Sequence, residues 1–177
     1  EVARELCELA DVLEARTTLQ DVPLPGLESS QLSLHAHYEL REILTAVGWL
    51  TASSRTPFTS GVLPLKKRQL ELLFVTLDKS TGFHAGISYH DYAISRTQFH
   101  WQSQNSAAPS TMVGKRYLES PANGWRFQLF VRTNQSQPFM ACGPVRLSSA
   151  TGERPMSIVW QLEHPLPAQV FQKFSVL

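Results

Sequence analysis

The chain has 177 residues, with 16 Lys and Arg against 15 Asp and Glu, two cysteines and 42% hydrophobic residues. A chain of this length can bury a core without disulfides or a structural metal. It has no apolar run long enough to span a membrane, and no basic segment followed by a short apolar one, as in a secretory signal. We therefore expect a cytoplasmic globular protein with no membrane contact, and its start at Glu1 suggests a piece of something longer.

The net charge of +1 conceals a division along the chain. Residues 1–45 carry nine acids and three arginines, a net charge of −6, so the remaining 132 residues carry +7. Such an asymmetry between segments is typical of proteins with a polyanionic partner. The basic part of the chain is therefore the candidate nucleic-acid surface.

The N-terminal third has the pattern of amphipathic helices. Over residues 2–15, apolar side chains recur at helical spacing, at Val2, Leu6, Leu9 and Leu13. A second helix is predicted over residues 38–47, because an apolar stripe is followed by Gly48 as a C-terminal stop. The Ser/Thr/Pro-rich stretch 51–60 is typical of a loop.

After Gly61 the pattern changes to short strands. Residues 70–77 are apolar on both faces, as in a buried central strand, and residues 125–132 alternate, with Trp125, Phe127, Leu129 and Val131 on one face. Further strands are predicted over residues 89–95, 98–103, 139–142, 145–148 and 156–162, with breaks at Gly143-Pro144 and residues 151–155. Regular strands without intervening helices favour an antiparallel barrel or sandwich.

These patterns together predict an α+β fold within one compact domain. Helices in residues 1–60 are followed by a β-rich body over residues 61–177, which we expect to form an antiparallel β-barrel or pseudobarrel. The body carries the positive charge, and so we expect it to face the polyanionic partner.

Catalytic motifs are absent from the sequence. Gly114-Lys115-Arg116 lacks the first glycine and the hydroxyl residue of a phosphate-binding loop, and no Gly-x-Ser-x-Gly is present. The six histidines and two cysteines show no metal-ligand spacing, and acids are scarce in the basic body. We therefore predict a domain that is not an enzyme and that needs no cofactor or metal.

The predicted strand 98–103 has a core face and a polar face. Alternation places Phe99, Trp101 and Ser103 on the first, and His100, Gln102 and Gln104 on the second. A glutamine amide donates and accepts hydrogen bonds in one plane, as recognition of a base edge requires. The alternative is that these polar groups face solvent or satisfy the backbone.

Most of the body's positive charge is arginine, which can contact phosphate or guanine through two parallel hydrogen bonds. The residues concerned are Arg96, Lys115, Arg116, Arg126, Arg132, Arg146 and Arg154. The alternative is a solvated barrel exterior.

Several motifs carry a resemblance to a known family. They are Leu73-Phe74-Val75-Thr76-Leu77-Asp78-Lys79-Ser80, Tyr89-x-Asp91-Tyr92-Ala93-Ile94-Ser95, Phe99-His100-Trp101-Gln102-Ser103-Gln104, Gly143-Pro144-Val145 and Arg154-Pro155-Met156-Ser157-Ile158-x-Trp160. Across about residues 32–165 the chain resembles an uncharacterised bacterial domain family found at the C-terminal end of DEAD/DEAH-type helicases, often behind a phospholipase-D-like nuclease domain. Family members usually open the helix near residue 38 with a Tyr-Thr-Arg-like cap, from which Tyr38-Glu39-Leu40-Arg41 departs.

The resemblance implies a role in bacterial defence. Some proteins of this type look like modification-dependent (type IV) restriction enzymes, in which the helicase translocates, the nuclease cuts and the C-terminal domain reads the target. The implied partners are modified double-stranded DNA, with 5-methylcytosine favoured, and the helicase and nuclease domains of the parent chain. By analogy, a PUA-like or SET-and-RING-associated (SRA-like) barrel would suit such a reader.

This implication gives each candidate residue a role at a flipped base. Tyr89, Tyr92 and Trp101 would stack on the base, Asp91 would accept from the cytosine N4 amino group, and His100, Gln102 and Gln104 would read polar edges. Arg96, Lys115, Arg116 and Arg154 would hold phosphates. The alternatives are a core position for Trp101 and a turn-fixing role for Asp91.

Two other functions remain open. The domain could be a protein-interaction module that docks a helicase core or partner subunit through the acidic residues 1–45. It could also read a phosphorothioate backbone, which requires an apolar surface beside an arginine rather than a base pocket.

Overall fold

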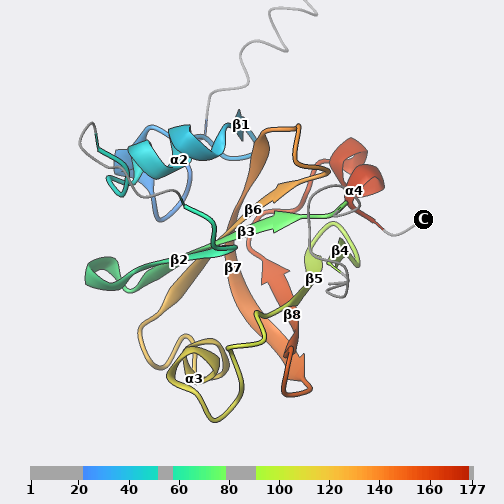
Figure 1. Cartoon of the computed structure of the whole chain (residues 1–177). Coiled ribbons are helices and arrows are strands. Elements are labelled where there is room, and N and C mark those ends of the chain that lie inside the picture. Colours follow the sequence, from blue (N-terminus) through green and yellow to red (C-terminus); the bar gives the residue numbers. More distant parts are fainter. Residues whose placement is uncertain (1–21, 52–57, 79–90, 176–177) are drawn as a thin grey trace, which may run out of the picture.

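Strand β3 (Leu70–Thr76) lies in the middle of the fold, and its seven residues are all buried (Figure 1). It pairs antiparallel with β2 (Val62–Leu65) and parallel with β6 (Arg126–Arg132). The prediction of a buried central strand is therefore confirmed. The computed structural model describes residues 22–51, 58–78 and 91–175.

The eight strands form one mixed sheet that does not close. Its order is β2-β3-β6-β7-β8-β5-β4, with β1 paired to β7. The remaining strands are β1 (His37–Tyr38), β4 (Tyr92–Ala93), β5 (Gln98–Gln102), β7 (Phe139–Thr151) and β8 (Ser157–Leu162). The predicted α+β class with a pseudobarrel-like sheet is confirmed, although the parallel β3–β6 pair is a departure from a wholly antiparallel sheet.

Three α-helices flank the sheet within the described residues. They are α2 (Leu40–Ala46), α3 (Met112–Leu118) and α4 (Ala168–Phe174), and two short 3-10 helices span Glu28–Ser30 and Lys66–Arg68. The helix predicted over residues 38–47 is confirmed as α2, whereas that over residues 2–15 lies outside the described part of the chain. No α-helix in the described ranges is long and apolar enough to cross a membrane.

Strand β7 is longer than the sequence predicts. The expected break at Gly143-Pro144 is wrong, because β7 continues through it as a single strand of 13 residues. The register against β6 shifts here, between the pairs Leu129–Gly143 and Phe130–Ala141, which leaves Cys142 as an extra residue in a β-bulge. Gly143 has a φ of 92°, and a Cβ there would lie 2.7 Å from Leu34 Cδ1, so only glycine fits.

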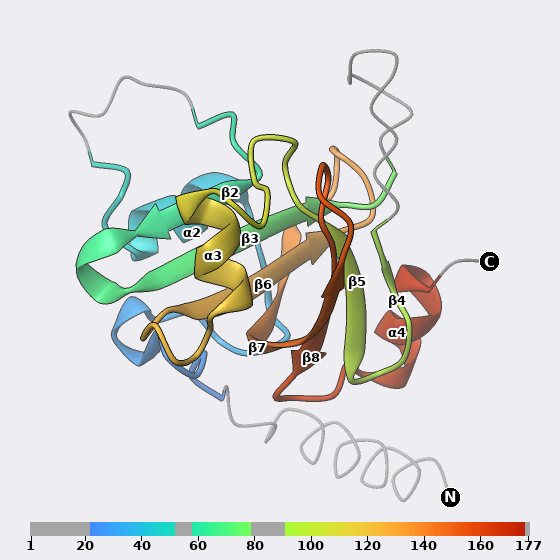
Figure 2. The same cartoon turned by 90° about the horizontal axis from the view of Figure 1, so that it is seen from below.

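Alternating residues of β3 and β6 supply two separate cores, one on each face of the sheet. Leu73 and Val75 join a cluster with residues of β5, β8 and α4. Leu72 and Phe74 join a second cluster with residues 24–50, which include α2. Figure 2 shows α2 and α3 covering different parts of the sheet. The predicted face of Trp125, Phe127, Leu129 and Val131 is confirmed, since the last three belong to the first core and Trp125 packs against it.

One carboxylate interrupts this apolar pattern. Glu71, in the middle of β3, is fully buried and forms an ion pair with Arg116 of α3. The Tyr117 hydroxyl donates to the other carboxylate oxygen at 2.7 Å. Burial, together with the Glu71 charge, raises the pKa of Tyr117 far above its ordinary value, so this hydroxyl stays protonated. The three side chains thus fasten α3 to the central strand.

Replacing Glu71 tests this attachment. Glu71→Gln should lower the free energy of unfolding by about 3–5 kcal/mol, because it leaves Arg116 without its buried counter-charge. Glu163→Gln is the matched control, because it removes an ion pair with Arg146 at the surface. The side chain of Glu163 is 33% exposed and that of Arg146 is 70% exposed, so this change should cost about 0–1 kcal/mol. Urea denaturation measures both, and equal losses would contradict a special role for Glu71.

His35 makes stability sensitive to pH. Its Nε2 is buried without a hydrogen-bond partner among the described residues, and burial, followed by the charge of His164, lowers its pKa. As the pH falls below about 6.5, the unfolded chain binds a proton that the folded chain does not, so stability should decline. His35→Asn, which tolerates the φ of 62° at this position, should flatten that decline in urea titrations between pH 7 and 5. An unchanged slope would contradict the assignment.

Candidate functional site

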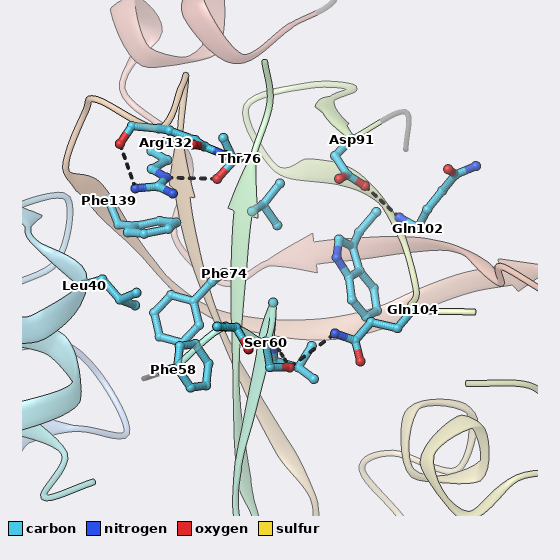
Figure 3. Close-up of a pocket in the computed structure, with 16 residues that line it drawn as sticks. Leu40, Phe58, Ser60, Phe74, Thr76, Asp91, Gln102, Gln104, Arg132 and Phe139 are labelled. Carbon is cyan, nitrogen blue, oxygen red and sulfur yellow. Dashed lines mark hydrogen bonds between the residues drawn. The ribbon is translucent and has the colours of Figure 1, made fainter. Parts of the chain in front are cut away.

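A pocket of about 430 Å³ lies where the two ends of the sheet approach each other without pairing. Beside it, the side-chain amide of Gln104, just after β5, donates to Ser60 Oγ, just before β2, at 3.2 Å. The pocket is lined by Leu40, Phe58, Thr59, Ser60, Gly61, Val62, Phe74, Val75, Thr76, Asp91, Trp101, Gln102, Gln104, Arg132, Gln135 and Phe139 (Figure 3). This gap in the pseudobarrel is our candidate site.

Asp91 and Gln102 form the polar side of the pocket. Asp91 directly precedes β4, and its Oδ1 accepts a hydrogen bond of 2.8 Å from the backbone N–H of Gln102. The carboxylate therefore caps the end of β5, where the two-residue strand β4 no longer pairs. In Figure 3, Asp91, Gln102 and Gln104 lie together on one side of the pocket.

Aromatic rings form an apolar wall opposite. The ring of Phe74 contacts those of Phe58 and Phe139 edge to face, at centroid distances of 5.5 and 5.4 Å. Phe74 also stacks on Phe130, which lies in the core beneath. Contacts of this geometry hold the rings in place, so the wall is formed before any ligand arrives.

Arg132, one of the arginines of the basic body, lies at the end of this wall, although it is not among the residues predicted to read the base or hold phosphates. Its Nε donates to Thr76 Oγ1 at 2.9 Å, its Nη1 donates to the Gln135 carbonyl at 3.1 Å, and its guanidinium lies 4.3 Å from the Phe139 ring centre. Burial lowers the pKa of Arg132, and the nearby Glu39 charge opposes this shift. Its position at the C-terminal end of a predicted strand was the signal available in the sequence.

The structure brings four of the seven predicted base-reading residues to this pocket: Asp91, Trp101, Gln102 and Gln104. The predicted division of the strand into two faces is confirmed, since Phe99, Trp101 and Ser103 are buried and His100, Gln102 and Gln104 are half-buried. Trp101 is only 4% exposed and packs on Tyr117 and Trp160, so it is a core residue that borders the pocket.

The other predicted base-reading residues lie elsewhere. Tyr92 and His100 are cross-strand partners whose rings stack at 4.9 Å, and His100 Nε2 is 2.5 Å from Ser157 Oγ. Neither residue lines the pocket. Tyr89 lies outside the described residues.

The predicted phosphate-binding residues are spread over several elements. Arg116 must be removed from this set, because its guanidinium pairs with Glu71 and lies 4.0 Å from the Trp125 ring centre. The Nε of Arg96 donates to the Leu166 carbonyl at 2.7 Å and so holds the segment that leads into α4. Lys115 in α3 and Arg154 between β7 and β8 are exposed.

Within the described ranges, no group of three or more His, Cys, Asp or Glu side chains is placed to hold a metal ion. The residues that line the pocket instead include one aspartate, three glutamines, one arginine and an aromatic wall. Such a set can orient a planar polar ligand by hydrogen bonds and by ring contacts.

Comparison with known proteins gives one finding. No curated protein matches the chain. A family model described as a domain of unknown function, DUF3427, matches residues 32–174, which include every described residue of the pocket. The chain therefore belongs to the family DUF3427.

Proposed function

We propose that this domain is a non-catalytic reader of a modified base in double-stranded DNA, with 5-methylcytosine as the favoured mark. The observation that carries the proposal is the meeting of Asp91, Gln102 and Gln104 beside an aromatic wall in one pocket. As the resemblance implies, the parent protein would be a helicase–nuclease of a modification-dependent restriction system, in which this domain selects the target.

The pocket chemistry suits a cytosine that carries an apolar substituent. A carboxylate can accept several hydrogen bonds at once, so Asp91 can bind the N4 amino group while it accepts from Gln102. The side-chain amide of Gln104 can donate to the ring nitrogen or carbonyl of the base, whereas the Gln102 side chain points away from the pocket in Figure 3 and would have to rotate to reach it. The rings of Phe58 and Phe74 would then contact the substituent and exclude water from it.

The sizes of the expected free energies indicate which contacts provide affinity and which provide selectivity. A methyl group in a fitted apolar pocket is worth roughly 1–3 kcal/mol, about 10- to 200-fold in affinity. Extruding a base from the duplex costs a few kcal/mol, and contact with an aromatic face returns roughly 1–3 kcal/mol. Phosphate contacts must therefore provide most of the affinity, and the exposed Lys115 and Arg154 remain our candidates for them.

Binding to three duplexes of one sequence tests the proposal: one methylated, one unmodified and one with a phosphorothioate backbone. Fluorescence anisotropy should show tighter binding to the methylated than to the unmodified duplex, by about 10-fold or more, because only the methylated base has a methyl group that contacts the aromatic wall. Affinity for both should fall steeply as salt increases.

Each other outcome of this titration counts against the proposal. Equal affinity for methylated and unmodified duplexes would contradict it. A preference for the phosphorothioate duplex would support a backbone reader instead. Absence of DNA binding, together with a stable complex with helicase fragments, would support the interaction module.

Asp91→Asn separates recognition from affinity. The amide oxygen can still accept from the Gln102 N–H, but the new NH₂ group would face the cytosine amino group and disfavour insertion of the base. Both duplexes would then bind through phosphates alone, so the preference for the methylated duplex should fall by about 10-fold. Lys115→Ala should do the opposite, weakening both duplexes by a similar factor, because phosphate contacts carry no sequence information. If Asp91→Asn lowers only the unfolding free energy, then Asp91 merely caps β5.

A further inference from the structure

Arg132 has the features of an anion-binding residue, and the proposed function gives no role to the part of the pocket in which it lies. Its guanidinium is half-buried, and no carboxylate in the described part of the chain forms an ion pair with it. Its bonds to Thr76 and Gln135 use two of its five N–H donors. A cation that is partly desolvated without a counter-ion gains from an anionic ligand.

Neither Glu39 nor Asp91 forms an ion pair with Arg132. Glu39 influences the Arg132 charge, but its carboxylate accepts from a backbone N–H in the first turn of α2 as the helix cap. Asp91 lines the same pocket, where its Oδ1 accepts from Gln102. Figure 3 shows Asp91 and Arg132 at opposite sides of the pocket, with Thr76 between them.

The guanidinium is also held in a fixed orientation. Thr76 and Arg132 are aligned partners at the C-terminal ends of the parallel strands β3 and β6, so the bond between them is built into the sheet register. The Phe139 ring supports the guanidinium from one side. A guanidinium held in this way can present two N–H groups to an anion without first losing side-chain freedom.

We propose that Arg132, supported by Thr76 and Phe139, is a phosphate-binding subsite of the pocket. Where the phosphate belongs to DNA the inference rests on the proposed function, with the phosphate at Arg132 and the base at Asp91. The same chemistry would bind the phosphate of a free nucleotide, and the experiment distinguishes these two sources.

The chain offers a matched control on the same strand. Arg126 begins β6 and Arg132 ends it, but Arg126 is exposed and does not line this pocket. We expect Arg132→Gln to weaken the binding of both methylated and unmodified duplexes by about 10-fold. It should also reduce the slope of log K against log salt concentration by about one, with discrimination retained. Arg126→Gln should change neither quantity to this extent.

Arg132→Lys keeps the charge but not the guanidinium, and so should have an intermediate effect on affinity. Thermal unfolding of each variant establishes that it is folded. If Arg132→Gln does not fold, Arg132→Lys and the titration below still decide the matter. Salt slopes equal to that of the unsubstituted chain in both folded variants would overturn the DNA-phosphate form of the proposal.

A second measurement does not depend on DNA recognition. The Arg132 Nε–Hε resonance, assigned by its loss in Arg132→Lys, should shift when the unsubstituted chain is titrated with inorganic phosphate or 5-methyl-dCMP. A shift in a chain that binds no duplex would indicate a nucleotide site, and the proposed function would fail while the subsite stands. No shift with either probe, combined with unchanged salt slopes, would overturn the subsite itself.

Discussion

The parallel pairing of β3 with β6 is the constraint on which the rest of the structure depends. Seven residues of each strand pair in register, from Leu70–Arg126 to Thr76–Arg132. Parallel neighbours cannot be joined by a tight turn, so the chain must cross over between them, here through residues 77–125. That crossover contains β4, β5 and α3, and it brings the polar residues 91–104 to the same end of the sheet as Thr76 and Arg132. The candidate site is therefore a consequence of the parallel direction of β3 and β6.

The buried ion pair sets where the crossover lies. Isolated buried pairs often contribute little net stability, because desolvation of the two charges offsets their attraction. The pair of Glu71 with Arg116 is more informative about position, since Arg116 and Tyr117 contact different oxygens of one carboxylate. Two directional bonds from consecutive residues fix both the place and the rotation of α3 over the sheet. An apolar contact of similar area would fix neither so closely.

Local patterns in the sequence predicted local structure well. The alternation around Trp101 assigned the two faces of β5, and the apolar run at residues 70–77 identified the central strand. The prediction failed at Gly143, because a glycine that permits a bulge resembles one that ends a strand. It also failed for Arg116, since its partner Glu71 lies 45 positions away, and only strand order brings the two together. The meeting of Asp91 with Arg132 in one pocket depends on the parallel pair, which no local pattern encodes.

The pocket holds opposite charges apart. In many proteins an aspartate and an arginine in one cavity would approach each other, and the cavity would close around the pair. Here each is tied to its own backbone neighbour, Asp91 to the Gln102 N–H and Arg132 to the Gln135 carbonyl, with the aromatic wall beside them. A ligand that contacts both groups must carry a hydrogen-bond donor at one end and an anion at the other, with a planar group between them that can lie against the aromatic wall. A nucleotide with an amino-bearing base has such a donor and such an anion, and this is why we propose one as the ligand; groups held in place by the fold lose little side-chain freedom on binding.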